Sequence, residues 1–569
     1  MKIYLPIIIA LTIIPLITMI DINPTANEII NPPTVKLDIK PYTTFYEGDI
    51  INCEITGQPN VFYWTIENRS KHYTFHENKP VLFDPEPTPL EKEYVNLTVH
   101  VENTHGIDTD TIPIKIKRIF FGDIHWHTTY GDGVNEIYTM YENAIKDNYL
   151  DFAASSEHAT NILYYMNKPF PIINMIKDRI RKQDPWTVIK EMAVKYNDPG
   201  RFTTLLGYEY SVSTGSPGGY KWSKAGHEDV SHINFYFKDI YPDAKRYNSY
   251  QKFTYDDILK AMSDEWDKGH YNIGFPHHPL GKIYWKTLGE HRLFEYIYTV
   301  NWSYLARGIE NTEERDKILR GVEVYSRWGT AIGKYSDIPI TWPYLPDISP
   351  YTLCIHDQTD AWVENAMWEW SSEQFNGRKF VMQAGSDTHF SDRPGSAEIG
   401  KEKVSGIIAA YSVHNNRSEI WNAMNECEIY GTQLLKIRAN VRFEDEISYG
   451  KWINCNGPLN INITAFSTFP GLDCSGRNMC PFNYSEENLN YPISDIWIIK
   501  KDVERGRPWC KIINHTTPNK NLAVINFEDP DVKPNDFYYI AIKQKGQNLI
   551  HDKDEYMAYI GPVFINKVN

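Results

Sequence analysis

The sequence has little cysteine, no excess of positive charge and few long hydrophobic runs. Seven cysteines in 569 residues are too few for a disulfide scaffold. Lys plus Arg number 58 against 73 Asp plus Glu, a net charge of −15, which argues against sequence-independent binding of nucleic acid. We find no G-x-S-x-G or Walker-type loop, so neither a serine nucleophile elbow nor a P-loop is indicated.

What the chain does contain is enough apolar material for large cores. Hydrophobic residues make up 42% and aromatic residues 14%, which excludes global disorder. A length of 569 residues predicts several domains.

One long apolar run begins the chain. Met1 and Lys2 precede the stretch Ile3–Ile20, which Asp21 closes. This pattern is typical of a signal peptide, or of an uncleaved membrane anchor through residues 3–20, so we assign residues 1–21 to export. The remainder is then extracellular or on the cell surface.

Four cysteines fall near the C-terminal end. If the protein is exported, they allow three pairings into two disulfides; the alternative is buried thiols. They are Cys455, Cys474, Cys480 and Cys510.

Both flanks of the chain show two-residue alternation. Residues 33–117 include Val61–Ile66 and Val95–Val101, which predict a small β-sandwich of immunoglobulin-like or PKD-like type with Trp64 in its core. Residues 437–569 show similar runs, such as Phe537–Ile542, and predict a second β-sandwich.

The middle segment, residues 118–436, alternates between strand-like and helix-like runs. Apolar residues at helical spacing from Ile137 to Ile145 predict an amphipathic helix after the first strand. Metal-capable or charged residues lie at one end of each of seven predicted strands. These segments are Ile119–His127, Leu150–His158, Phe202–Glu209, His232–Phe237 (where the histidine leads), Tyr271–His278, Gly321–Ser326 and Phe380–His389.

Parallel strands followed by helices, with reactive groups at their carboxyl ends, predict a (β/α) barrel with one active rim. Residues i and i+2 of a strand share a face, so His125 with His127 and Asp387 with His389 can each hold a metal. Mixed imidazole and carboxylate ligands favour Zn, Mn or Fe over Mg or Ca.

The order and spacing of these motifs resemble the PHP (polymerase and histidinol phosphatase) superfamily, and within it a large, often exported branch filed as a domain of unknown function. The resemblance covers roughly Arg118 to Ile437. The segments that carry it are Gly122–Gly133, Ser156–His158, Asn197–Glu209, His232, Pro276–His278, Gly321–Ser326 and Gly385–His389.

The resemblance implies a distorted seven-stranded (β/α)7 barrel, flanked here by the two small β-sandwiches, that holds two or three divalent ions. Glu209 would bridge metals, and one of His277 and His278 would bind, with His277 favoured because it directly follows the strand-ending proline. The implied metal ligands are His125, His127, His158, Glu209, His232, His277 or His278, Asp387 and His389. Two positions depart from the family pattern: Glu157 replaces a common Asp, and Gly131 replaces a frequent Ser before Asp132.

These features predict a phosphoesterase that uses hydroxide generated by the metals, which also neutralise charge on phosphoryl oxygens. We assign catalytic roles to Asp387, Glu209 and Arg393, the last as a phosphate clamp, with Arg327 as a second candidate clamp. Glu323 is expected to support a ligand rather than to bind metal itself.

Two alternatives stay open. One is a metallohydrolase that cleaves a non-phosphate ester, amide or glycan bond. The other is a non-catalytic cell-surface binding protein with structural metals. The expected partner is a small-molecule or polymer ester, with no nucleic acid as a structural partner; the sequence does not indicate an oligomeric state.

Overall fold

The computed structural model describes residues 31–568 with interruptions. The residues left out are 68–70, 73–74, 77–78, 83–87, 132, 147–149, 160–183, 212–231, 249–250, 252–253, 278–279, 287–291, 300–304, 307–311, 327–328, 339–351, 355–361, 390, 396–404, 434–435, 468–491 and 546–554.

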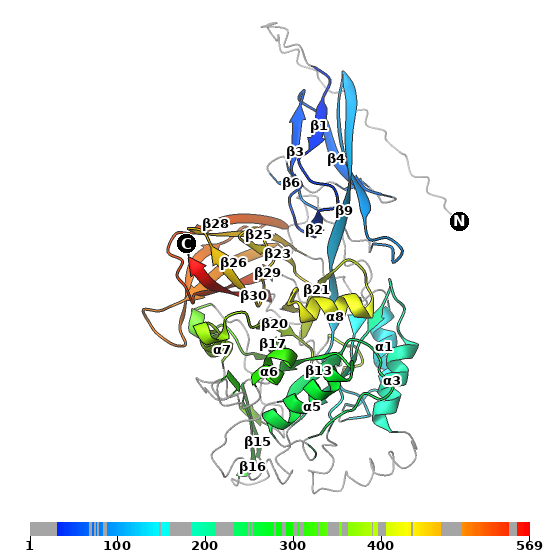
Figure 1. Ribbon diagram of the computed structural model, residues 1–569, viewed down its shortest axis with the longest axis vertical. Helices are drawn as coiled ribbons and strands as arrows, with labels where there is room; N and C mark the ends of the chain where they lie inside the picture. Colours follow the sequence, from blue (N-terminus) through cyan, green and yellow to red (C-terminus); the bar gives the residue numbers. More distant parts are fainter. Residues whose placement is uncertain are drawn as a thin grey trace, which may run out of the picture.

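Strands alone form the N-terminal part, which projects from the body (Figure 1). They are β1 (Thr34–Leu37), β2 (Thr44–Tyr46), β3 (Cys53–Thr56), β4 (Val61–Ile66), β5 (Lys71–His72), β6 (Phe75–His76), β7 (Lys79–Pro80), β8 (Val95–Asn103) and β9 (Gly106–Asp123). The prediction that Trp64 lies in the core is confirmed, since its side chain is fully buried in a cluster separate from the main core.

Strand β9 connects this projection to the body. It is 18 residues long and crosses the boundary that we expected between residues 117 and 118. Its first residues alternate between exposed and partly buried, whereas its last six are all buried. One end therefore belongs to a half-solvated sheet and the other to the interior of the molecule.

The seven strand segments predicted in the middle of the chain all contain strands. After the end of β9 these are β10 (Phe152–Ala153), β11 (Thr203–Thr204), β12 (Leu206–Tyr210), β13 (Ile233–Phe237), β14 (Asn272–Pro276), β17 (Gly321–Ser326) and β20 (Val381–Ala384). Two further strands, β21 (Gly406–Ser412) and β22 (Ile429–Gln433), pair onward from β9.

The predicted (β/α)7 barrel is wrong. Strand β10 pairs in parallel with both β9 and β11, and β17 with β20, but β12, β13 and β14 are antiparallel, as are β9, β21 and β22. The described strands do not close into a barrel. His232 stands at the start of β13, so β13 has to run against its neighbours to bring that side chain to their carboxyl ends.

The flanking strands share a sheet with strands of the middle segment. A 14-stranded sheet contains the path β27-β26-β29-β30-β22-β21-β9-β8-β4-β5. A second sheet has the strand order β23-β25-β28. The C-terminal strands of the two sheets are β23 (Arg438–Phe443), β24 (Trp452–Cys455), β25 (Leu459–Phe466), β26 (Ile493–Lys501), β27 (Cys510–Thr516), β28 (Leu522–Asp529), β29 (Phe537–Lys545) and β30 (Glu555–Val568).

Helices pack beside the central strands (Figure 1). The described ones are α1 (Ile137–Ile145), α3 (Pro185–Lys195), α5 (Tyr255–Asp267), α6 (Thr312–Ile318), α7 (Val363–Trp370) and α8 (Arg417–Asn425). The predicted amphipathic helix is confirmed as α1, whose buried side chains include Ile137, Met140 and Tyr141. A capping box at Thr254 and Asp257 begins α5. The remaining described strands are β15 (Leu280–Lys286), β16 (Arg292–Thr299), β18 (Gly329–Thr330) and β19 (Thr352–Cys354).

A buried ion pair ties the N-terminal projection to the C-terminal strands. The guanidinium of Arg438 donates to Glu47 Oε1 at 2.6 Å, and the two side chains are 5% and 0% exposed. The other oxygen of Glu47 accepts from the backbone N–H of Ile119 at 3.0 Å. Because Ile119 lies on β9, this pair also fixes the strand that leads to His125.

The structure bears on the predictions for the two ends of the chain, the C-terminal disulfides and the N-terminal leader. Cys455 and Cys510 are buried free thiols and so are not paired with each other, whereas Cys474 and Cys480 lie outside the described residues. The predicted leader, residues 1–21, also lies outside them. Within the described part of the chain, none of the helices has the length and hydropathy needed to span a membrane.

Replacing Glu47 by Ala leaves the buried guanidinium of Arg438 without this carboxylate. We expect the free energy of unfolding, measured by urea denaturation, to fall by about 3–5 kcal/mol. Glu93, which pairs with Lys115 at the surface, supplies the control, and Glu93→Gln should leave the unfolding curve unchanged. Equal effects of the two substitutions would contradict the role given to Glu47.

Candidate metal centre

The first two candidate ligands follow directly from β9. His125 and His127 lie just beyond the last residue of that strand, and both are fully buried. Backbone hydrogen bonds join this segment to the one after β20: the N–H of Asp387 donates to His125 O at 2.6 Å, and that of His127 to Thr388 O at 2.9 Å. These bonds bring two segments 260 residues apart in the chain to one edge.

The antiparallel strands deliver a second group of ligands. Glu209 lies in β12, His232 directly precedes β13 and His277 directly follows β14. The N–H of His277 donates to His232 O at 3.0 Å, so the start of one strand meets the end of the next. His158 comes from the segment after β10 and forms a parallel bridge with Glu209.

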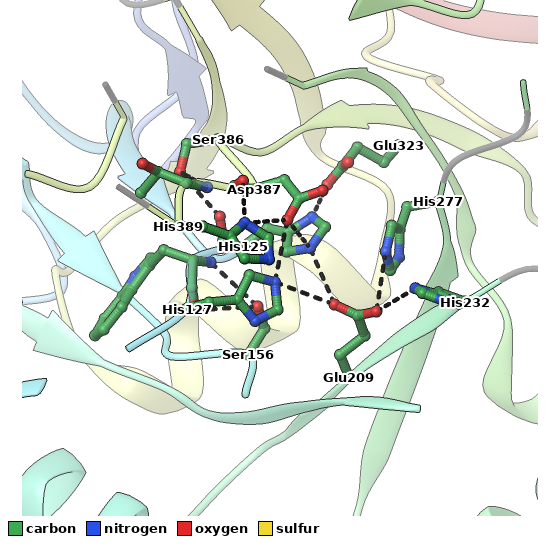
Figure 2. Close-up of polar contacts among 12 residues, drawn as sticks. His125, His127, Ser156, Glu209, His232, His277, Glu323, Ser386, Asp387 and His389 are labelled. Atoms are coloured by element: carbon green, nitrogen blue, oxygen red, sulfur yellow. Dashed lines mark hydrogen bonds and ion pairs between the residues drawn. The ribbon is translucent and has the colours of Figure 1, made fainter. Parts of the chain in front are cut away.

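The carboxylate of Glu209 lies between two sets of imidazoles (Figure 2). Its Oε1 is 3.0 Å from Nδ1 of His158 and 3.4 Å from Nε2 of His277, and it also contacts His232. Its Oε2 is 3.2 Å from Nε2 of His127 and 3.4 Å from Nε2 of His125. Each oxygen thus faces a different set of nitrogen donors.

Asp387 faces the same imidazoles from another direction. Its Oδ1 is 3.0 Å from Nε2 of His127, 3.3 Å from Nε2 of His125 and 3.5 Å from Nδ1 of His389. The backbone of Asp387 has φ of 50°, a left-handed conformation that non-glycine residues rarely adopt. Strained backbone of this kind is concentrated at functional sites.

The donor atoms gather closely enough to hold metal ions. Within each of four overlapping groups of buried residues, the ligand atoms lie within 4.8 Å of one another. The groups are His127, His158 and His389; His125, His277 and Asp387; His125, His127 and Glu209; and His158, Glu209 and His232. Imidazoles combined with carboxylates suit divalent transition metals, so the residues present fit such ions.

Glu323 and Gln383 orient His125 from the side away from the cluster. Nδ1 of His125 is 2.8 Å from Oε2 of Glu323, which also accepts from Gln383 at 3.4 Å. A carboxylate on Nδ1 fixes the ring and leaves Nε2 available to a metal. Gly385 is required here because a Cβ would lie 2.6 Å from both Glu323 Oε2 and Cβ of His125.

Asp123 supports the backbone of the candidate centre, and the sequence interpretation did not single it out. Its buried carboxylate accepts from the backbone N–H groups of His125 at 3.0 Å, Ser386 at 3.0 Å and Gly395 at 2.6 Å. Burial raises the pKa of Asp123 to about 6, although these hydrogen bonds oppose the rise. Its place two residues before His125, on the same face of an extended segment, is the signal that could have found it.

Gly131 and Glu157, the two positions that depart from the pattern the sequence resembles, lie next to each other. A Cβ added at Gly131 would lie 2.4 Å from Oε2 of Glu157. The longer Glu157 thus occupies the space that a side chain at position 131 would need. Asp132, which lies between these features in the predicted motif, is outside the described residues.

Buried charges in the cluster shift the pKa values of its members. Burial lowers the pKa of His125, but the carboxylates of Glu323 and Asp387 outweigh it and hold the pKa well above its ordinary value. Burial and the neighbouring His158 likewise lower the pKa of His127, yet hydrogen bonds to Asp387 and Glu209 raise it to about 9. Burial raises the pKa of Glu209, but the surrounding imidazoles bring it well below its ordinary value.

Eight of the nine predicted ligands therefore lie in one buried cluster, and His278 is outside the described residues. Of the two candidate phosphate clamps, Arg327 is also outside them. Arg393 is half-buried in the turn after His389, where its N–H donates to Ser391 Oγ at 3.1 Å.

Comparisons with known proteins gave matches of two kinds. Residues 134–279 match the family model described as "Protein of unknown function (DUF3604)". This span contains His158, Glu209, His232 and His277. A solved structure from Bacteroides vulgatus ATCC 8482, a two-domain protein containing a predicted PHP-like metal-dependent phosphoesterase, is 11% identical. That alignment covers 78% of this chain and 95% of the other, with a TM-score of 0.30. A search of curated proteins found no match.

The raised histidine pKa values predict competition between protons and metal. Below about pH 9 the metal-free centre holds a proton on His127, and the raised pKa of His125 favours a proton there as well; a divalent ion must displace these protons to bind neutral imidazole. The affinity for Zn²⁺ should therefore rise with pH toward about 9, with proton release visible by calorimetry in buffers of different ionisation enthalpy. An affinity independent of pH would contradict this.

Proposed function

We propose that this protein is an exported, PHP-like metal-dependent phosphoesterase. The observation that carries the proposal is the position of Glu209, with one oxygen toward His158, His232 and His277 and the other toward His125 and His127. A carboxylate placed between two sets of imidazoles would be able to bind more than one ion. Sites that contain several metals are common in phosphoester hydrolysis.

The chemistry divides between the ions and the chain. When bound, such ions supply a nucleophile from water at neutral pH and neutralise charge on phosphoryl oxygens. The chain's own residues would hold the ions in place. Glu209 and Asp387 bring negative charge between the imidazoles, and Glu323 fixes the ring of His125. Arg393 follows His389 closely in the chain and is the candidate for contacting a phosphoryl oxygen.

The number of donors argues against a purely structural role for the metals. A structural zinc site is closed by four ligands, whereas eight side chains converge here. The same centre could also attack a non-phosphate ester, amide or glycan bond, and a substrate panel separates these reactions. Export rests on the sequence of residues 1–21, and an ester substrate outside the cell completes the proposal.

Removing the metals or one of their ligands should abolish turnover. We expect chelator treatment to eliminate hydrolysis of 4-nitrophenyl phosphate or bis(4-nitrophenyl) phosphate, and Zn²⁺ or Mn²⁺ to restore it. His127→Ala and Asp387→Asn should each lower kcat/KM by about 100-fold or more. His105 is exposed in the turn between β8 and β9 and is outside the cluster, so His105→Ala is the matched histidine control.

Three outcomes would count against the proposal. Activity that survives both chelation and His127→Ala would exclude a metal-dependent reaction at this centre. Turnover of carboxylic esters or glycosides, but of no phosphoester, would assign the same centre to another bond. A metal-loaded protein inactive on the whole panel would favour a binding protein.

A further inference from the structure

A cavity of about 560 Å³ borders the segment that carries the candidate ligand His158. Its lining includes Ala159, Asp184, Trp186, Arg246, Tyr247 and Gln251. This volume falls within the range of small-molecule sites, and the lining combines aromatic rings and amides with two cations and one carboxylate.

The cavity shares a wall with the candidate metal ligands. Ala159 directly follows His158 in the chain, and its N–H donates to the backbone oxygen of Glu209 at 2.7 Å. The segment that presents His158 to the centre therefore also borders the cavity.

Hydrogen bonds hold the chain on either side of Arg246 to helices α3 and α5. On one side, Trp186 Nε1 and Lys190 Nζ, both from α3, donate to Ala244 O at 2.8 Å and 3.1 Å. On the other side, the hydroxyl of Tyr247 donates to Glu265 Oε1 of α5 at 3.0 Å. Arg246 is thus presented by a fixed backbone, which reduces the entropy lost when it binds a ligand.

The guanidinium of Arg246 is partly buried but forms no hydrogen bond or ion pair with any described residue. Asp184 and Glu157 act on it only through longer-range charge. A guanidinium carries five donors in a planar fork suited to carboxylate or phosphate, and it loses solvation on burial unless a partner compensates. Lys245 adds a second positive charge to the same wall.

We propose that Arg246 binds a second anionic group of the substrate, at the end of the molecule away from the phosphoester that is hydrolysed. The cavity is many times larger than the roughly 30 Å³ that a water molecule occupies, so it can hold the organic part of a substrate. The substrate class is then a phosphoester whose organic part carries a carboxylate or another phosphate. This inference rests on the proposed function, which supplies the site for the first phosphate.

Two matched pairs of substrates test the proposal on the metal-loaded protein. Phenyl phosphate is compared with 4-carboxyphenyl phosphate, and glycerol 1-phosphate with glycerol 1,3-bisphosphate. For at least one pair, the wild type should prefer the member with the second anion by about tenfold or more in kcat/KM. Arg246→Gln should remove that preference through KM with little change in kcat, and Arg246→Lys should retain part of it.

Lys260, which is exposed on α5, provides the control, because its replacement by Gln also removes one positive charge. Lys260→Gln should keep the wild-type preference.

A binding measurement makes the test independent of turnover. Calorimetric titration compares benzylphosphonate with 4-carboxybenzylphosphonate, neither of which is hydrolysed. The carboxylate should tighten binding by about tenfold in the wild type and Lys260→Gln but not in Arg246→Gln. Comparing the thermal midpoints of the variants shows whether each one folds, and Arg246→Lys serves if the Gln variant does not.

The failures of the two proposals are distinguishable. If metal-dependent hydrolysis is present but the wild type shows no preference, or Arg246→Gln keeps it, the role of Arg246 is overturned and the phosphoesterase stands. If the wild type hydrolyses neither member of either pair and binds neither phosphonate, both proposals are overturned.

Discussion

The buried carboxylate of Glu209, in contact with imidazoles on both of its oxygens, is the interaction around which the rest of the centre is arranged. A carboxylate and several histidines placed together without water are costly unless opposite charges offset one another. Here the imidazoles lower the pKa of Glu209, while the carboxylates raise those of His125 and His127. These carboxylates and imidazoles, whose charges offset one another, are also the oxygen and nitrogen donors that bind divalent ions.

Bringing these side chains together constrains the backbone around them. Strand β9 carries His125 and His127 to the centre, and its position is fixed by Glu47 from the N-terminal strands and by Asp123 at its end. The carboxylate of Asp123 joins the His125 segment to the backbone of Ser386, next to Asp387. A glycine at position 385 then allows the two segments to approach. The flanking strands therefore contribute to the geometry of the site through the long sheet that they share with it.

The sequence predicted the candidate ligands better than it predicted the arrangement of the strands in the sheet. Histidines and carboxylates at strand ends are visible as local patterns, and eight of the nine predicted ligands converge. Strand direction depends on distant partners, so the barrel prediction failed where β13 runs against β12 and β14. The position of His232 before its strand indicated the direction of β13. If all the ligands meet at one edge, a strand that begins with its ligand must run opposite to strands that end with theirs. Asp123 and Arg246 escaped notice because their roles depend on backbone groups and a cavity that only the folded chain forms.

The central claim is that these side chains form one centre for several metals, with Glu209 between the ions. Anomalous X-ray scattering at the absorption edge of the bound element locates such ions directly in crystals of the metal-loaded protein. We expect two or three anomalous peaks inside the cluster, with Glu209 coordinating at least two of them and His125, His127 and Asp387 among the other ligands. The absence of a peak there, or a single ion that Glu209 does not contact, would contradict it.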